Sequence, residues 1–311
     1  MVSTGKGYSK IILFGEHFVV YGLPGIASGI DRFVEIKIQP IEEDTIIIDD
    51  PTFFKEKVNI KQNPEHIKSK IFKPIIDKYN LNKIKITFNG DAIPGGGMGL
   101  SASLAVAMAR ATSDYLNLDL KDEEINELAF ECEKVSHGTP SGIDNTCATY
   151  GTTILFEKNI DNEKNNTKIL KCAKPLHLLI VDTGIKKEST KKIVEMVAKK
   201  KEENKKEFEK IFSDYKKIIV KAKQELKFGG IQEIGKLMNQ NQELLRKIGV
   251  SCNEAEEIIR TVTFENCLGA KVTGAGCGGN VIVLCETEEQ KNKIFETLKA
   301  KNYSLIKTKI S

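Results

Sequence analysis

The pattern of apolar and polar positions along the chain predicts a series of short β-strands. Residues 10–14 (Lys-Ile-Ile-Leu-Phe) indicate a buried strand, and the alternation at 34–38 and 83–88 indicates half-buried strands. Shorter apolar runs predict further strands at 46–48, 152–156, 176–181, 270–272 and 281–284.

Helical periodicity predicts most of the remaining elements. An alanine-rich helix is expected to begin at Leu100 or Ser101 and to end near Leu116, and a second helix is expected over 122–135. Glycine and proline mark 137–145 as a loop. Residues 159–168 are rich in Asn, Lys and Asp and predict an exposed turn or linker. Further helices are expected at 190–228, 231–245, 253–264 and 287–300.

The order of these elements favours an α+β fold of two domains. Hairpin-like strands occur early in the chain, which argues against a doubly wound parallel sheet. The length of 311 residues is typical of about two domains. We expect the first domain to span 1–174 and the second 175–311.

Composition and charge exclude several classes of protein. Apolar residues make up 40% and charged residues 29%, which is typical of a globular chain. The formal charge of +4 is small for a dedicated nucleic-acid binder. The lysines of 186–227 alternate with acidic residues, which indicates a solvated helix face. No apolar stretch approaches the roughly 20 residues that span a membrane, and no secretory signal is evident.

The cysteines indicate a reducing environment. The seven cysteines are scattered, and no pair has the Cys-x-x-Cys spacing of a structural zinc site. Free thiols of this kind suit the cytoplasm, which is where we expect the protein to act.

A glycine-rich turn between a strand and a helix is the strongest local candidate for a ligand site. Its glycines allow a close approach to the backbone, and no acidic residue lies between Pro94 and Arg110 to neutralise the helix N-terminus. An anion, most plausibly a phosphate, fits such a site, and Ser101 and Ser103 could bind phosphate or Mg²⁺. The alternative is a turn whose serine only caps the helix. The spacing matches neither a Walker P-loop nor a dinucleotide fingerprint. The turn and the start of the helix are Gly95, Gly96, Gly97, Met98, Gly99, Leu100, Ser101, Ala102 and Ser103.

Other candidate residues each have a structural alternative. Asp144 could be a catalytic carboxylate or could organise its loop through an Asx turn. Glu16 and His17 follow the first strand and could bind a polar ligand or form a satisfied edge pair. Glu133 lies at the flank of an apolar helix face. Lys10 is unusual because a lysine that leads a buried strand needs a partner or an exit to solvent.

Three blocks of sequence together resemble the GHMP kinase superfamily, and within it the mevalonate kinases. The first is Lys-Ile-Ile-Leu-Phe-Gly-Glu-His-Phe-Val-Val-Tyr-Gly at 10–22. The second is the turn at 97–103, followed by Glu133 and by His-Gly-Thr-Pro-Ser-Gly-Ile-Asp-Asn at 137–145. The third is Thr-Gly-Ala-Gly-Cys-Gly-Gly at 273–279. The blocks occur in the order of the family and extend over most of the chain.

The resemblance implies an enzyme that uses ATP and Mg²⁺ to phosphorylate the C5 hydroxyl of mevalonate, in a cleft between two domains. By position, Lys10 and Asp144 would form the catalytic pair, and Ser101 and Glu133 would hold Mg²⁺. The backbone of the turn at 95–103 would bind the phosphates of ATP, and the turn at 274–279 would support it. The residues assigned to the substrate pocket are Glu16, His17, Thr190, Gly274, Ala275 and Gly276.

Departures from the family pattern keep other substrates open. The phosphate turn is one residue shorter between Pro94 and Met98, Leu100 replaces a serine, and Cys277 replaces a glycine. The alternatives are phosphorylation of phosphomevalonate, of the 3-hydroxyl of mevalonate or of a sugar such as galactose, and a ligand sensor without turnover. We expect no membrane or nucleic-acid partner, and a homodimer is the default assembly.

Overall fold

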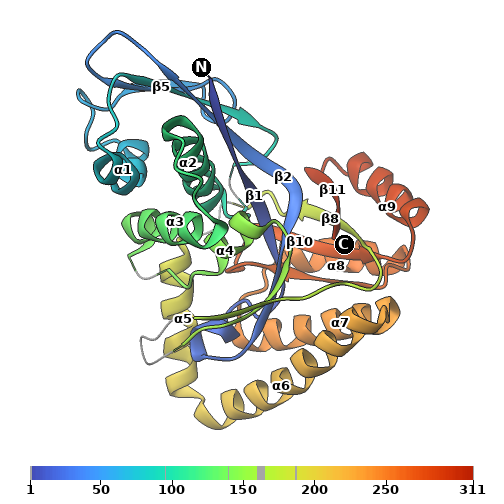
Figure 1. The fold of residues 1–311 in the computed structure, drawn as a ribbon. Coiled ribbons are helices and arrows are strands. Elements are labelled where there is room, and N and C mark those ends of the chain that lie inside the picture. Colours follow the sequence, from blue (N-terminus) through green and yellow to red (C-terminus); the bar gives the residue numbers. More distant parts are fainter. Residues whose placement is uncertain (1, 95, 139, 160–164, 186–187, 311) are drawn as a thin grey trace. The chain divides into compact units, whose positions relative to one another are not determined.

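The structure, a computed structural model, describes residues 2–94, 96–138, 140–159, 165–185 and 188–310. The chain forms two compact units, each built from several segments (Figure 1). The division of the chain into domains at residue 174 stays a prediction. The first unit comprises Met1–Lys10, Gly29–Pro94 and Met98–Gly151, and the second Ile11–Ser28, Gly95–Gly97 and Thr152–Ser311.

Strands β1 (Ser3–Phe14) and β2 (Gly25–Pro40) pair with each other, and each contributes residues to both units. In the first unit, β5 (Ile84–Gly90) pairs antiparallel with β2 and parallel with β3 (Ile46–Asp50). The edge strand β4 (Glu56–Asn59) is antiparallel to β3. The predominance of antiparallel pairing confirms the α+β class expected from the sequence.

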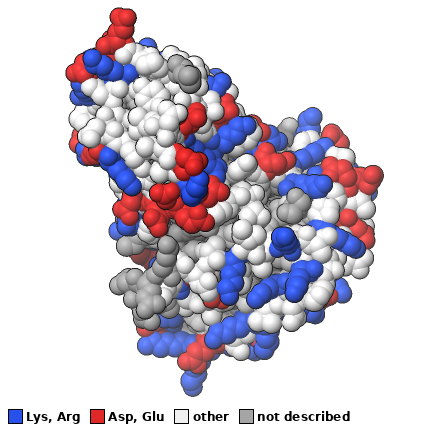
Figure 2. All heavy atoms as spheres, in the orientation of Figure 1, with Lys and Arg blue, Asp and Glu red and all other residues white. Residues whose placement is uncertain are grey.

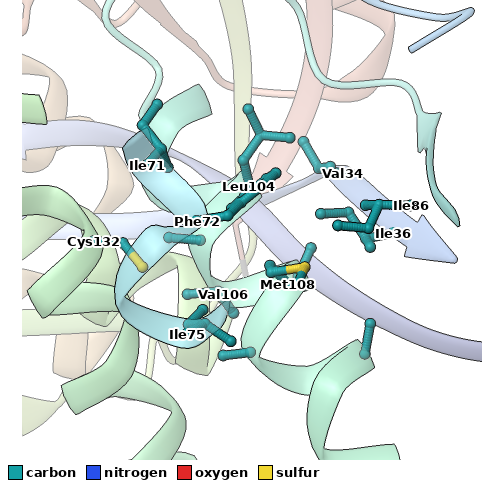
Figure 3. Packing of buried hydrophobic residues seen from close by; sticks show 14 of the residues in the cluster. Val34, Ile36, Ile71, Phe72, Ile75, Ile86, Leu104, Val106, Met108 and Cys132 are labelled. Carbon is teal, nitrogen blue, oxygen red and sulfur yellow. The ribbon is translucent and has the colours of Figure 1, made fainter. Parts of the chain in front are cut away.

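Helices α1 to α4 pack together in the first unit. Their bounds are α1 (Ile67–Tyr79), α2 (Leu100–Leu116), α3 (Asp122–His137) and α4 (Ile143–Tyr150). The alanines of α2 are buried on nearly all sides, which allows neighbouring elements to approach the helix closely. Figure 3 shows aliphatic side chains of the β-strands beside those of α1 and α2, with Cys132 of α3 at the margin. This core fixes the positions of α2, α3 and α4, which carry the candidate residues Ser101, Glu133 and Asp144.

The second unit is built around a four-stranded antiparallel sheet in the order β11-β8-β10-β9. Helices α7, α8 and α9 pack against this sheet, and α5 and α6 pack against α7. The unit also contains the 3-10 turn η1 (Phe18–Tyr21) and strands β6 and β7, of which β6 pairs with Gly25–Ser28 of β2. The bounds are β6 (Thr153–Glu157), β7 (Asn166–Ile169), β8 (Leu176–Asp182), α5 (Thr190–Glu203), α6 (Lys205–Phe228), α7 (Ile231–Ile248), α8 (Asn253–Phe264), β9 (Gly269–Thr273), β10 (Asn280–Cys285), α9 (Glu288–Ala300) and β11 (Leu305–Ile310).

Three local expectations from the sequence differ from the structure. Residues 143–145 belong to α4 and not to a loop, because Gly142 (φ 88°) allows the chain to enter a helix there. The expected single helix over 190–228 is broken at Asn204, whose side chain donates to Lys200 O at 3.1 Å and competes with regular helix geometry. Residues 166–169 form β7 at the end of the expected linker, and 160–164 lie outside the described residues.

On the face shown in Figure 2, acidic side chains lie among the basic ones of the described residues. None of the described helices is long and apolar enough to cross a membrane.

Candidate functional site

Lys10 and Asp144 form an ion pair in the first unit. Lys10 lies on β1, where its side chain is 4% exposed, and its Nζ is 3.0 Å from Asp144 Oδ1. The backbone N–H of Lys10 donates to Met98 O at 3.0 Å, which fixes the strand beside the glycine turn. A Cβ at Gly99 would lie 3.2 Å from Lys10 Cγ, so the turn passes close to the lysine. The lysine therefore has the partner that its buried position requires.

Asp144 is held firmly on one side and is open to solvent on the other. It lies in the first turn of α4, and its side chain is 34% exposed. Thr146 Oγ1 donates to Gly142 O at 2.6 Å and fixes the start of the helix. A carboxylate that is anchored by a buried ammonium group and is still accessible can accept a proton from a bound hydroxyl group.

Ser101 and Glu133 bring two oxygen donors together in the same unit. Ser101 lies at the start of α2 and donates from Oγ to Glu133 Oε1 of α3 at 2.5 Å. Glu133 is only 3% exposed. The described residues contain no group of three or more His, Cys, Asp or Glu that could hold a metal ion alone. A hydroxyl and one carboxylate fit Mg²⁺ bound together with phosphate oxygens and water, because Mg²⁺ is usually held in that way.

The glycine turn leads into α2 with backbone conformations that favour glycine. Gly96, Gly97 and Gly99 have φ angles of 62°, 76° and 74°, and Gly95 lies outside the described residues. The first turn of α2 contains no acidic residue. The backbone N–H groups and the helix dipole at this position are therefore suited to binding an anion.

The side chains of the turn differ in burial and therefore in whether a ligand could reach them. Ser103 is fully buried, and its hydroxyl is shared between Tyr8 O at 2.7 Å and Gly99 O at 2.9 Å. Met98 and Ala102 are buried as well, and Leu100 packs against the core of the first unit. Backbone groups and Ser101 therefore remain as the polar groups of this segment that face a ligand.

Gly96 is held by a residue that the sequence analysis did not single out. Asn280 Nδ2 donates to Gly96 O at 3.0 Å, within the second unit. A Cβ at Gly96 would lie 2.2 Å from that same nitrogen, so the contact requires glycine at this position. Asn280 directly follows the glycine turn at 274–279. This position is the one feature of the sequence that could have indicated its role.

Glu16 and His17 of the second unit are buried, and their side chains contact other residues of the same unit. The side chain of Glu16 is inaccessible and is paired with Lys271. His17 is 3% exposed, and its Nε2 lies 2.8 Å from Ala275 O. Burial lowers the pKa of His17, an effect that the contacts with Ala275 O and Glu16 only partly offset. The ring is therefore neutral near pH 7 and donates from Nε2 to the carbonyl group.

The remaining expected substrate residues fall into two groups. Gly274 and Ala275 are partly exposed, whereas Gly276 is buried and packs close to Val250 O. Thr190 is exposed at the start of α5. The structure brings Lys10 and Asp144, and likewise Ser101 and Glu133, together in the first unit. In the second unit it brings His17 to Ala275.

Sequence reasoning missed Lys271 and Asn241, which both contact Glu16. Lys271 carried a signal, since a lysine in the apolar run at 270–272 must find a buried partner, just as Lys10 must. Asn241 lies on the buried face of the amphipathic helix α7, and no feature of the sequence indicates its role.

Comparison with known proteins shows that two separate parts of the chain match domains of one family. The family model of the GHMP kinase N-terminal domain matches residues 66–152, and that of the C-terminal domain matches 221–304. A mevalonate kinase of Methanocaldococcus jannaschii is 34% identical over 93% of each chain. A mevalonate kinase of Pyrococcus furiosus is 31% identical over 91% of this chain and 89% of its own length.

A solved structure also resembles the whole chain. The crystal structure of L. major mevalonate kinase in complex with R-mevalonate has a TM-score of 0.89 and 36% identity. It covers 99% of this chain and 95% of its own.

Proposed function

The chain belongs to the GHMP kinase family, and on that premise we propose that it transfers the γ-phosphoryl group of ATP to the C5 hydroxyl of mevalonate. The family and the enzyme class predicted from the sequence, an ATP-dependent kinase most like the mevalonate kinases, are confirmed by the similar proteins. The substrate follows from the names of those proteins, one of which is solved with R-mevalonate bound. The observation that carries the chemistry is the pair formed by buried Lys10 and accessible Asp144.

Asp144 is the group that takes the proton of the alcohol. As the hydroxyl oxygen forms a bond to the γ-phosphorus, the bond from that phosphorus to the leaving oxygen of ADP breaks, and the proton passes to an Asp144 oxygen. Lys10 keeps the carboxylate in place and stabilises the negative charge that develops on the attacking oxygen. Phosphoryl transfer depends mainly on such positioning and charge stabilisation.

The first turn of α2 receives the phosphates of ATP. Backbone N–H groups after Gly99 donate to phosphate oxygens, and the absence of acidic residues there leaves the helix dipole uncompensated. Ser101 and Glu133 would hold Mg²⁺, which neutralises phosphate charge when bound. Asn280 orients the carbonyl group of Gly96 and supports the conformation of the turn.

A reducing compartment suits the cysteines. All seven cysteines are free. Burial raises the pKa of Cys132 to about 12, so this thiol stays protonated and unreactive at neutral pH. We therefore place the protein in the cytoplasm, where thiols stay reduced.

The test is an acceptor panel for the purified protein. ADP release with Mg·ATP is followed in the presence of mevalonate, mevalonate 5-phosphate, galactose and a few other polyols. We expect turnover with mevalonate well above that with every other acceptor. Turnover only with another acceptor would replace the substrate and keep the kinase. ATP binding with no turnover on any acceptor would favour a ligand sensor on the same fold.

A further inference from the structure

Two hydrogen-bonded links join the segment around the end of β1 to β9 and the turn that follows it, all within the second unit. Thr273 Oγ1 donates to Ile12 O at 2.9 Å and accepts from Ile12 N–H at 3.0 Å. Farther along both segments, His17 Nε2 contacts Ala275 O at 2.8 Å. The two segments are therefore tied together at both ends of a short stretch.

A buried ion pair lies beside these two links. Lys271 Nζ contacts Glu16 Oε1, and both side chains are inaccessible to solvent. Glu16 Oε2 accepts from Asn241 Nδ2 and from Gly15 N–H, both at 3.1 Å. The ammonium group of Lys271 also donates to Val272 O at 2.7 Å. Both carboxylate oxygens are thus bound by protein donors, and the inaccessible side chain of Glu16 presents no surface to a substrate.

Stability alone is a poor explanation for this pair. The desolvation of two buried charges offsets most of their attraction, so apolar residues of similar volume commonly replace such a pair without loss of stability. Burial also lowers the pKa of Lys271, although Glu16 opposes this shift. A fixed geometry is what a buried pair with directional contacts provides and an apolar pair does not.

The part of this cluster that solvent reaches is the backbone of the turn. Gly274 and Ala275 are partly exposed, and a Cβ at Gly274 would meet no atom within 4 Å. Ala275 O is bound by His17, the neighbour of Glu16. The pair is therefore connected to the exposed residues 274–275 through His17, which follows Glu16 in the chain and contacts Ala275 O.

We propose that Glu16 and Lys271 are a positioning pair that sets the backbone of Gly274 and Ala275 for binding of the alcohol substrate. Glu16 itself does not touch the substrate. This inference rests on the proposed function, because the binding step that it concerns is that of mevalonate. It replaces the expectation from the sequence that Glu16 lines the substrate pocket.

The test is a double-mutant cycle with Glu16→Gln, Lys271→Met and the combined variant. Each single variant leaves one buried charge without its partner, whereas the combined variant removes both charges. We expect each single variant to raise KM for mevalonate about tenfold, with kcat within about threefold of the wild type. We expect KM for mevalonate in the combined variant to return most of the way to the wild-type value. Lys271→Arg, which keeps the charge, should stay closer to the wild type than Lys271→Met.

Lys68→Met is the matched control. Lys68 is also a buried lysine in an ion pair, with Asp50 at 2.5 Å, and it belongs to the first unit. This variant should lower the melting temperature without changing KM for mevalonate. If Lys68→Met raises that KM as much as Lys271→Met does, the effect is general destabilisation and the proposal is wrong.

Two further results would overturn the proposal. One is a raised KM for mevalonate in Glu16→Gln that the combined variant does not lower again. That result is expected of a residue that contacts the substrate. The other is a KM for mevalonate in Lys271→Met that equals that of the wild-type protein. If the wild-type protein phosphorylates an acceptor other than mevalonate, the proposed function fails. The cycle is then measured on that acceptor, and recovery or its absence still decides the role of the pair.

Discussion

Lys10 Nζ and Asp144 Oδ1 lie 3.0 Å apart, yet the two side chains differ in their access to solvent. Lys10 is 4% exposed, whereas Asp144 is 34% exposed. The strand residue therefore acts as a fixed, enclosed cation, and the helix residue presents a carboxylate to whatever binds beside it. This asymmetry separates the pair from an ordinary surface ion pair, in which both partners are solvated.

Replacement of Asp144 with Asn tests its role as the proton acceptor. We expect kcat to fall at least about 100-fold, because an amide cannot take the proton of the alcohol. The folded state should persist with a modest loss of stability. The expected loss is smaller than the roughly 3–5 kcal/mol that it costs to break a fully buried ion pair, because Asp144 is partly exposed. Steady-state kinetics and thermal unfolding measure the two effects.

The control for Asp144→Asn is ATP binding, measured by calorimetry. We expect an affinity for Mg·ATP close to that of the wild type, since the role proposed for Asp144 concerns the alcohol and not the nucleotide. A kcat near the wild-type value in this variant would show that another group takes the proton.

Replacement of Ser101 with Ala tests the proposed Mg²⁺ site. Loss of one oxygen ligand should raise the Mg²⁺ concentration needed for half-maximal activity several-fold, and Glu133→Gln should raise it further because it removes a charge. Ser113→Ala is the matched control, since Ser113 lies at the other end of α2 and accepts from Leu120 N–H. A Mg²⁺ titration of Ser101→Ala that matches the Ser113→Ala control would contradict the assignment.

Replacement of Asn280 with Ala tests the support of the phosphate turn. The variant loses the bond to Gly96 O, and we expect KM for ATP to rise about fivefold to tenfold with KM for mevalonate unchanged. Asn239→Ala is the control, because Asn239 bonds Leu268 O and Ala270 N–H beside β9 and does not contact Gly96. Equal effects of both variants on KM for ATP would refute a specific role of Asn280.

Titration of His17 predicts a loss of stability in mild acid. Burial holds the pKa of His17 in the folded state below its ordinary value of 6.5. Below about pH 6.5 the unfolded state therefore binds more protons than the folded state, and stability falls as the pH decreases towards the folded-state pKa. Denaturant unfolding at pH 7.5 and pH 5.5 measures this change.

His17→Gln is the comparison for that titration, since a glutamine amide can donate to Ala275 O and does not titrate. We expect the wild type to lose more stability between the two pH values than the variant does. Equal losses in both proteins would mean that other groups account for the acid sensitivity.

The sequence predicted those elements whose periodicity is strong and whose ends are marked. Helix α8 begins and ends where the pattern indicated, and α2 begins at Leu100. Helix α1 was missed because Lys68 and Ser69 lie on its buried face and Pro74 lies inside it, which weakens the helical pattern. Helix α4 has eight residues, too few for a clear period.

The resemblance supplied the pairs Lys10–Asp144 and Ser101–Glu133, and the structure brings the members of each pair together. Lys10 was notable as a lysine in a buried strand, but spacing alone could not select Asp144 as its partner. Glu16 shows the opposite case, since the motif that contains it suggested a ligand contact and the structure buries it against Lys271. Tertiary contacts between distant segments decide such questions, and local patterns do not contain them.

The position of the transferred phosphate tests the central claim most directly. The product of the wild-type protein with Mg·ATP and mevalonate would be identified by ³¹P NMR, beside the same reaction with Asp144→Asn. We predict mevalonate 5-phosphate as the product of the wild type, and at most traces of it from the variant. A phosphate on the 3-hydroxyl, or equal product from both proteins, would contradict the account.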